Sequence, residues 1–227
     1  MIACFVTGTD TGVGKTLSSC ALLHALAQHH PRVVGMKPVA SGAQRDGQAG
    51  WANEDSIALR TASTLKVAAS LDNPFLLADP VSPHIAAERA NVVVTLPPIL
   101  AAFQALHQQA DAIVVEGAGG WQVPLSPSLR IADLALALQL PVVLVVGMRL
   151  GCLNHALLTA DAIRASGLQL AGWIASHVDP HMLEPEANMN YLRAHIGAPL
   201  LADIPWQAQP DASTITVHLP KEWTCKP

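Results

Sequence analysis

The stretch that decides the fold reads Val6-Thr7-Gly8-Thr9-Asp10-Thr11-Gly12-Val13-Gly14-Lys15-Thr16 and lies between two different periodicities. Residues 2–7 are apolar and predict a short buried strand, whereas residues 17–28 are rich in Ala and Leu, lack Gly and Pro, and predict a helix. A glycine-rich turn that follows a strand and ends in Gly-Lys-Thr is typical of a phosphate-binding loop, or P-loop. Five residues separate Gly8 from Gly14-Lys15, one more than in the standard pattern.

The residue types in this turn suit a polyphosphate. Gly12 and Gly14 can adopt positive φ and so let backbone N–H groups approach phosphate oxygens, and the following helix N-terminus adds partial positive charge. Lys15 is placed to reach the β- and γ-phosphates, and the Thr16 hydroxyl is placed to ligate Mg²⁺. The alternative is a glycine-rich turn that only caps a helix. The order of strand, turn, Lys-Thr and helix favours the P-loop.

The composition predicts one soluble, enzyme-sized domain. Of the 227 residues, 51% are hydrophobic and 13% are charged, and no Gly/Ser-rich or charged linker divides them. So few charges favour burial of surface in an oligomer, but abundant Ala would also inflate the apolar count without forming patches, and both explanations stay open. We expect a single domain over residues 1–227 with a poorly defined C-terminal tail at 207–227.

Charge and hydropathy exclude several classes of partner. The formal net charge of −4 leaves no basic footprint, so we expect no nucleic-acid partner. No apolar run approaches the roughly 18 residues of a membrane span, and the N-terminus lacks a basic segment followed by an apolar one. We therefore expect no membrane partner and a cytoplasmic location.

Cysteine and histidine usage argues against a disulfide framework and a zinc site. Cys4, Cys20, Cys152 and Cys225 are scattered without a Cys-x-x-Cys pair, which suits reduced thiols. His177 and His181 lie four apart, but Asp179-Pro180 between them argues against a helix that presents both to a metal. We expect these two histidines to lie in solvated loops.

Short apolar strands alternate with helical stretches along the rest of the chain. Strands are predicted at 33–37, 112–116, 142–146 and 170–175, and helices at 54–63, 98–109, 131–139, 154–166 and 186–196. Several of these strands are β-branched without polar alternation, as in parallel strands that are covered on both faces. The order predicts an α/β fold with a doubly wound, mainly parallel sheet flanked by helices. The proline-rich segment 66–97 gives no clear pattern.

Two charged residues close predicted strands. Lys37 ends one strand and is followed by residues 38–42, and Glu116 ends another and is followed by the glycine-rich residues 117–121. Open α/β sheets bind ligands at the carboxyl ends of their strands, so both side chains should face the P-loop, and Glu116 should hold Mg²⁺. The alternatives are a surface lysine at a sheet edge and a solvated strand-end acid.

Taken together, the motifs closely resemble one enzyme family, the dethiobiotin synthetases. The motifs read Gly-Thr-Asp-Thr-Gly-Val-Gly-Lys-Thr (8–16), Lys-Pro-Val-Ala-Ser-Gly (37–42), Val-Glu-Gly-Ala-Gly-Gly-Trp (115–121), Gly-Cys-Leu-Asn-His (151–155) and Ile-Pro-Trp (204–206). Their order and spacing cover about residues 2–206. The resemblance implies a fold of the P-loop NTPase type. Partition-type ATPases carry a second lysine where this chain has Asp10, and amide-forming synthetases of the cobyric acid kind carry a glutaminase domain that is missing here.

The resemblance implies an ATP-dependent ring closure in biotin biosynthesis. One amine of 7,8-diaminononanoate captures CO₂ as a carbamate, ATP phosphorylates the carbamate, and the second amine attacks the mixed anhydride to form the ureido ring and release phosphate. Lys15, Lys37 and Mg²⁺ would offset the repulsion between carbamate and triphosphate. By the family pattern, the hydroxyls of Thr11 and Ser41 hydrogen-bond the carbamate. Both nucleophiles belong to the substrate, so Cys152 is not read as catalytic.

The resemblance also carries ligand contacts onto this sequence. Metal ligation falls on Thr16, Asp55 and Glu116, although Asp55 could instead cap a helix and Glu54 lies beside it. Nucleotide contacts fall on Gly12, Val13, Gly14, Lys15, Thr16, Leu17, Asp55, Glu116, Gly117, Ala118, Gly119, Ser176, His177, Pro205, Trp206 and Gln207. Trp206 could equally belong to the core. The family usually has Asn where this chain has Ser176, and a serine lacks the paired donor and acceptor of an amide, so we expect weak discrimination between bases.

A last segment, Gly151-Cys152-Leu153-Asn154, opens a predicted helix whose backbone N–H groups could hold a carboxylate. The alternative is an ordinary glycine turn with an Asn cap. The resemblance implies that this segment receives the carboxylate tail of a substrate bound mainly by the neighbouring subunit, and hence that the protein is a homodimer.

Overall fold

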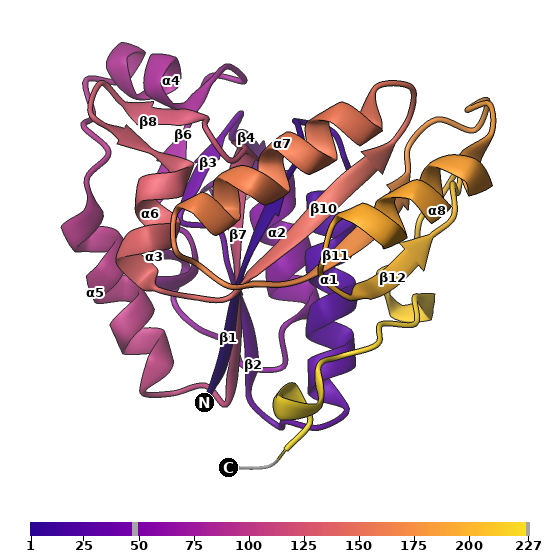
Figure 1. Cartoon of the computed structure of the whole chain (residues 1–227). Helices are drawn as coiled ribbons and strands as arrows, with labels where there is room; N and C mark the ends of the chain where they lie inside the picture. Colours follow the sequence, from indigo (N-terminus) through magenta and orange to yellow (C-terminus); the bar gives the residue numbers. More distant parts are fainter. Residues whose placement is uncertain (47–49, 226–227) are drawn as a thin grey trace.

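The computed structural model describes residues 1–46 and 50–225, and over these residues its centre is a parallel sheet of six strands (Figure 1). The strands lie in the order β12-β11-β10-β1-β7-β2. Their bounds are β1 (Ile2–Gly8), β2 (Val33–Met36), β7 (Ala112–Gly120), β10 (Val142–Met148), β11 (Leu170–His177) and β12 (Leu200–Ile204). Because β1 lies between β10 and β7, the turn that follows it lies near the middle of the carboxyl edge of the sheet.

Helices cover both faces of the sheet, which confirms the doubly wound architecture. They are α1 (Lys15–Ala27), α2 (Glu54–Ala62), α3 (Ala69–Asp72), α4 (Pro83–Arg89), α5 (Leu96–His107), α6 (Ile131–Leu138), α7 (Cys152–Ala165) and α8 (Pro185–His195). Alternate strand residues point to opposite faces, so Phe5 packs with α5 to α8 in one core while Cys4 and Val6 pack with α1 and α2 in the other.

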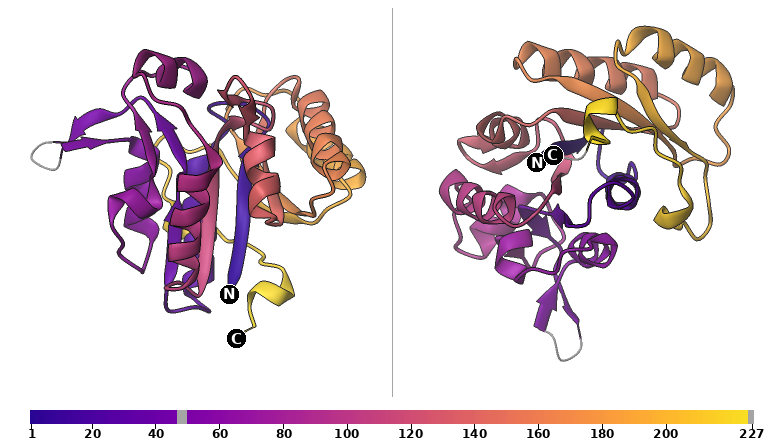
Figure 2. Two further views of the ribbon diagram at one scale, coloured as in Figure 1. Left: turned by 90° about the vertical axis from the view of Figure 1, so that its left-hand side faces the viewer. Right: turned by 90° about the horizontal axis from the view of Figure 1, so that it is seen from below.

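Short strand pairs decorate this framework. β3 (Val39–Ser41) pairs in parallel with β6 (Phe75–Leu77), and two hairpins are formed by β4 (Gln44–Asp46) with β5 (Gly50–Ala52) and by β8 (Pro124–Ser126) with β9 (Leu129–Arg130). The β4–β5 hairpin projects from the body of the molecule (Figure 2). Strand β3 follows β2 closely in the chain, so the β3–β6 pair lies near the carboxyl end of β2.

The sequence prediction of the main elements is confirmed, with several differences. Strand β7 runs on to Gly120, so Glu116 lies within this strand and the prediction that it ends the strand is wrong. Helices α5 and α7 each begin two residues earlier than predicted. Helix α1 begins at Lys15 rather than at residue 17, so the last two residues of the P-loop motif form its first turn. The proline-rich segment that showed no pattern contains α3, β6 and α4, and α4 and α5 each carry proline in their first two positions, where a missing N–H costs nothing. The edge strand β12 was not predicted because it is short and carries Asp203.

The tail is packed where the structure describes it. Ile215, Val217 and Leu219 pack against the core that contains α1, and Trp223 is buried in that core. His30 Nε2 donates a hydrogen bond to the carbonyl of Trp223 at 2.8 Å. Residues 212–214 and 221–223 form short 3₁₀ helices, so the part of the tail up to residue 225 has a defined course along the α1 face.

No helix in the described ranges combines the length and the apolar character needed to cross a membrane.

Candidate functional site

The P-loop lies between β1 and α1 at the carboxyl edge of the sheet. Gly14 has φ of 83°, which only glycine adopts readily, and a Cβ there would collide with the Ser176 hydroxyl. Val13 packs into the space left by Gly147, where a Cβ would lie 2.7 Å from its side chain. The loop is therefore seated directly against β10 and β11.

Lys15 is folded back onto its own loop. Its Nζ donates to the carbonyl oxygen of Asp10 at 2.9 Å. Burial, together with repulsion from Lys37, lowers the pKa of Lys15 to about 8. The P-loop lysine is thus a partly desolvated cation at the mouth of the site.

Four side chains from four parts of the chain meet beside the P-loop, and we call Thr16, Lys37, Asp55 and Glu116 the Lys37 cluster. Lys37 Nζ lies 2.6 Å from Glu116 Oε1 and 2.8 Å from Asp55 Oδ2. The Thr16 hydroxyl lies 2.6 Å from Asp55 Oδ1 and 3.1 Å from Glu116 Oε1. One cation and one hydroxyl therefore hold two carboxylates together.

Two members of the Lys37 cluster are buried, whereas Thr16 is half-buried and the Asp55 side chain is 39% exposed. Lys37 is 4% exposed and Glu116 is 0% exposed, so the alternatives of a surface lysine and a solvated strand-end acid are both wrong. The strands explain this burial: Met36 is in register with Val115, so Lys37 and Glu116 follow at adjacent positions of neighbouring strands. A lysine directly after β2 and a glutamate within β7 are thus placed side by side.

The electrostatics keep Lys37 and Asp55 ionised. Burial acts to lower the pKa of Lys37, but the attraction of Glu116 and Asp55 outweighs it and the net pKa is raised. Burial acts to raise the pKa of Asp55, but Lys37 and the hydrogen bond from Thr16 outweigh it and the net pKa is lowered. Lys37 is therefore an ammonium and Asp55 a carboxylate at neutral pH.

Two asparagines that the sequence reasoning missed hold this cluster in place. Asn53 Oδ1 caps α2 by accepting from the backbone of Asp55 at 3.0 Å, and its Nδ2 donates to the Ser41 carbonyl at 2.9 Å. Asn73 Nδ2 donates to the Lys37 carbonyl at 2.7 Å. The capping alternative for Asp55 is wrong because Asn53 is the cap and Asp55 faces the cluster. An Asn before an acidic first turn was the signal for Asn53; Asn73 carried only the turn signal of Asn-Pro.

A cavity of about 690 Å³ opens next to the cluster. Predicted residues from separate motifs line it together: Thr11, Gly12, Gly14, Lys15, Thr16, Lys37, Ser41, Asp55, Ala118 and Gly119. Segment 80–83, which precedes and opens α4, closes another side. Two lysines and, besides Thr16, the three hydroxyl side chains of Thr11, Ser41 and Ser82 therefore line one cavity, which suits an anionic ligand.

Four of the residues predicted to contact the nucleotide do not line this cavity, and they lie around the P-loop. Val13 packs under the loop, Leu17 lies in the first turns of α1, and Gly117 accepts a hydrogen bond from Lys37 at 3.2 Å through its carbonyl. Ser176 is 4% exposed with its hydroxyl against Gly14. Its side chain is thus turned to the P-loop backbone.

A second cavity of about 470 Å³ lies at the carboxyl ends of β11 and β12. His177, Pro205 and Trp206 line it, and His177 Nε2 pairs with Asp203 Oδ1 at 2.9 Å.

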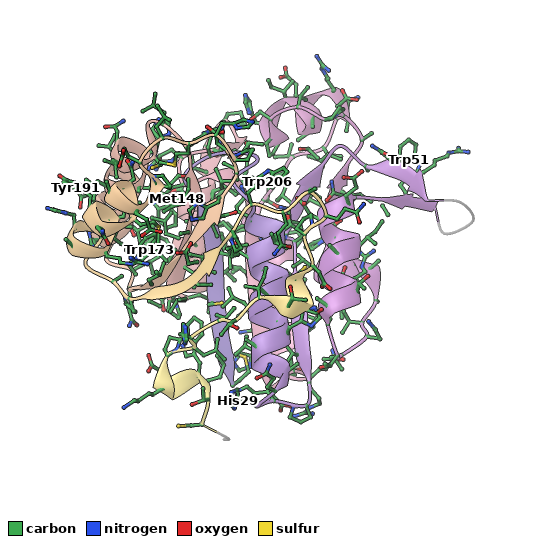
Figure 3. The ribbon with its side chains drawn as sticks, turned by 90° about the vertical axis from the view of Figure 1, so that its right-hand side faces the viewer. His29, Trp51, Met148, Trp173, Tyr191 and Trp206 are labelled. Atoms are coloured by element: carbon green, nitrogen blue, oxygen red, sulfur yellow. The ribbon has the colours of Figure 1, made fainter. Side chains whose placement is uncertain are left out.

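Two predictions about these residues are wrong. His177 ends a strand and is largely buried, so it does not lie in a solvated loop. Trp206 is 50% exposed, so the alternative that it belongs to the core is excluded. Figure 3 shows Trp206 at the opposite end of α1 from His29. Gln207 follows and accepts from the backbone of Asp211 at 3.4 Å.

The segment Gly151–Asn154 lies apart from the first cavity within one chain. Gly151, with φ of 94°, is the N-cap of α7 and no side chain caps this helix, so the Asn-cap alternative is wrong. The neighbouring Leu150 is 96% exposed and Leu158 is 62% exposed. Burial raises the pKa of the Cys152 thiol, which agrees with its reading as non-catalytic. Two exposed leucines thus lie close in sequence to the start of α7, one before it and one further along the helix.

The described residues contain no group of three or more His, Cys, Asp and Glu side chains that could hold a metal. The Lys37 cluster contains oxygen donors, namely two carboxylates and a hydroxyl. A P-loop with Gly-Lys-Thr at the carboxyl edge of a parallel sheet, facing such acids, defines a P-loop nucleotide-binding enzyme.

Comparisons with known proteins agree with this class. A family model described as "AAA domain" matches residues 3–214. The signal recognition particle receptor FtsY of Elizabethkingia anophelis, solved in complex with GDP, matches with TM-score 0.54 and 14% identity. That match covers 98% of this chain but only 62% of the receptor chain, and at this identity it shows the fold alone.

Curated relatives are much more similar. The ATP-dependent dethiobiotin synthetase BioD of Xanthomonas axonopodis pv. citri is 53% identical over 93% of this chain and 94% of its own length. The protein of the same name from Ralstonia nicotianae is 54% identical over 95% of this chain and 94% of its own length. The chain therefore belongs to the ATP-dependent dethiobiotin synthetase family, which confirms the resemblance drawn from its motifs.

Asn53 provides a test of how the site is built. Asn53→Ala removes the α2 cap and the donor to Ser41, so we expect a loss of about 1 kcal/mol in the free energy of unfolding together with lower turnover. Asn53→Ser keeps a capping oxygen and loses only the amide donor, so most of the stability should return while turnover stays reduced. Urea unfolding and steady-state kinetics measure both quantities. Equal stability of Asn53→Ala and the native chain would show that the cap does not support this site.

Proposed function

We propose that this protein closes the ureido ring of dethiobiotin from 7,8-diaminononanoate, CO₂ and ATP, and that the cavity beside the Lys37 cluster is where it does so. The observation that carries the proposal is the convergence of Lys15, Lys37, Thr11 and Ser41 on one cavity next to the P-loop. Family membership supplies the reaction, and this geometry supplies the residues. A reaction that consumes ATP fits a cytoplasmic location.

Lys15 and Lys37 carry the electrostatic part of the proposal. The reaction sets a carbamate against a triphosphate, and both are anions that repel each other. Two ammonium groups on one cavity offset this repulsion and stabilise the charge that develops on the transferring phosphoryl group. Thr11 and Ser41 supply hydroxyl donors that orient the carbamate oxygens.

The bonds balance without a covalent enzyme intermediate. The first amine adds to CO₂ and loses a proton to give the carbamate. The carbamate oxygen attacks the γ-phosphorus of ATP and ADP leaves. The second amine then attacks the carbonyl carbon and loses a proton, phosphate leaves with the C–O bond electrons and takes up a proton, and the ring closes. The protein's part is to position the reactants and to keep the charge balanced.

Thr16, Asp55 and Glu116 fit a Mg²⁺ ion. They are oxygen donors of the kind that Mg²⁺ prefers, and among the described residues Glu116 Oε2 is buried without a hydrogen-bond partner. When bound, Mg²⁺ would supply positive charge to the β- and γ-phosphates. Asp55 and Glu116 would hold it from α2 and β7, while Thr16 holds it from the first turn of α1.

The nucleotide would extend from the first cavity toward the second. The backbone of Gly12 to Leu17 cradles the phosphates, with Glu116 to Gly119 opposite. His177, Pro205 and Trp206 line the second cavity, and Gln207 adjoins them, so this is the proposed place of the base. Ser176 contributes through its packing against Gly14 rather than through an amide.

The homodimer completes the proposal. The segment Gly151–Asn154 has backbone donors at the start of α7, yet it does not line the first cavity of its own chain. The exposed side chains of Leu150 and Leu158 flank it and suit an interface between subunits. We place the substrate carboxylate at this segment of the neighbouring subunit.

Phosphate release tests the function directly. We expect release from ATP to require both diaminononanoate and bicarbonate as the source of CO₂, with dethiobiotin formed in equal amount. Lys15→Ala should lower kcat/KM about a hundredfold, roughly 3 kcal/mol, because one charge contact to the transition state is lost. Phosphate release that is independent of diaminononanoate would refute the proposed reaction.

Base selectivity is expected to be weak. No amide reads the base at position 176, so turnover efficiencies with ATP, GTP and CTP should lie close together. Ser176→Ala should leave their ratio unchanged because its hydroxyl faces Gly14. A strong preference for ATP that disappears in Ser176→Ala would contradict this assignment.

Mixed dimers test the shared site. Lys37→Gln disables the cavity of its own chain, and Asn154→Trp blocks the α7 start without requiring a bulky residue at the left-handed φ of Gly151. One site of a mixed dimer carries both lesions and the other carries none. After subunit exchange at equal amounts, about half of the dimers are mixed and about a quarter of the native activity should return. Confirmed exchange without any gain in activity would exclude a site shared between subunits.

A further inference from the structure

The ammonium group of Lys37 is fully engaged in this structure. A lysine has three N–H donors, and three acceptors surround Nζ: Glu116 Oε1 at 2.6 Å, Asp55 Oδ2 at 2.8 Å and the Gly117 carbonyl at 3.2 Å. The side chain is 4% exposed. In this arrangement Lys37 has no donor left for a carbamate, although it borders the cavity.

The same carboxylates are the ones that fit a metal ion. Asp55 and Glu116 together carry two negative charges, and Lys37 neutralises one of them. A Mg²⁺ ion binds oxygens at about 2.0–2.1 Å and would take its place among these atoms. The metal and the ammonium repel each other and compete for the same oxygens, so both cannot be held there at full strength.

The Lys37 side chain can move away from the two carboxylates, whereas its backbone is held by hydrogen bonds. The Lys37 N–H donates to the Asp72 carbonyl at 2.7 Å, and the Lys37 carbonyl accepts from Asn73 at 2.7 Å. The four-carbon stem is flexible, and the adjoining cavity, which Thr11 and Ser41 also line, has a volume of about 690 Å³. Because Thr11, Lys37 and Ser41 line the same cavity, a rotation of the side chain alone would move Nζ toward the hydroxyls proposed to hold the carbamate.

We propose that Lys37 takes the place of the metal ion in the nucleotide-free protein, and that arrival of the metal with the nucleotide releases its ammonium to the substrate. This inference rests on the proposed function for the identity of the metal ligands. It assigns Lys37 two successive roles: counter-ion of Asp55 and Glu116 first, and partner of the carbamate afterwards. The catalytic cation is thereby withheld until the metal and the nucleotide are bound.

A competition of this kind weakens binding of the metal alone. The metal binds only the fraction of molecules from which Lys37 has withdrawn, and its apparent dissociation constant rises accordingly. Removal of the Lys37 charge should therefore tighten metal binding even without any nucleotide. Lys15 is the matched control, because its Nζ bonds the Asp10 carbonyl and touches neither carboxylate.

The test measures binding of Mn²⁺ to the nucleotide-free protein by electron paramagnetic resonance. We expect Lys37→Gln to bind Mn²⁺ at least about tenfold more tightly than the native chain. Lys15→Gln should change the affinity far less, and Lys37→Arg, which keeps the charge, should stay near the native value. Equal affinities of Lys37→Gln and the native chain overturn the proposal. Equal tightening in Lys15→Gln also overturns it, since the effect would then be one of net charge.

A second measurement follows the native side chain, and a variant serves only to assign its signal. The ¹⁵N signal of the Lys37 ammonium, assigned by its loss in Lys37→Arg, should show slow exchange with water because all three N–H groups are bonded. Addition of Mg²⁺ with the β,γ-imido analogue of ATP should shift this signal and speed its exchange. An unchanged signal with bound nucleotide refutes the release. Neither measurement uses diaminononanoate, so a failure of the ring-closing function would appear only in the phosphate-release assay.

Discussion

The ion pairing of Lys37 with Asp55 and Glu116 is the interaction on which the site depends. It joins the end of β2, the first turn of α2 and β7, and through Thr16 it also reaches α1. Buried ion pairs add little net stability, because the cost of removing the charges from water offsets their attraction. Loss of one partner costs about 3–5 kcal/mol, however, since it leaves the others uncompensated. The ion pairs are therefore not explained by a gain in stability. The proposed chemistry of the site explains them better.

The register of three neighbouring strands makes this arrangement possible. Val6 of β1 is in register with Glu116 of β7, and Met36 of β2 is in register with Val115, so three neighbouring parallel strands reach the site at one level. The P-loop follows β1, the acid belongs to β7 in the middle of the three, and the lysine follows β2. Helices cover both faces of the sheet, so Glu116 within β7 and Lys37 directly after β2 are buried. Charges placed there must pair with each other or with a ligand.

Much of this was predictable from the sequence because the signals were local. The apolar runs around Val114 and Leu144 and the glycine-rich turn before Thr16 indicated the main strands, the order of layers and the P-loop. Burial was less predictable. Lys37 resembles a surface lysine until the register of β2 with β7 places Glu116 beside it, and that pairing joins residues far apart in the sequence.

The roles of Asn53 and Asn73 in positioning the site were even harder to predict from the sequence. Asn53 could be recognised as a cap, but its second bond to the Ser41 carbonyl depends on how β3 lies against α2. Asn73 bonds the Lys37 carbonyl only because the chain folds back after α3. The second cavity depends on β12, whose short sequence with Asp203 predicted no strand. Contacts of this kind follow from tertiary packing rather than from periodicity.

The most direct test of the central claim is a crystal structure of the protein with Mg²⁺ and the β,γ-imido analogue of ATP. We expect a metal ion bound by Thr16, Asp55 and Glu116, with Lys37 Nζ withdrawn from both carboxylates and turned into the cavity beside Ser41. A structure in which the nucleotide is bound while Lys37 still bridges Asp55 and Glu116, with the metal held elsewhere, would contradict it.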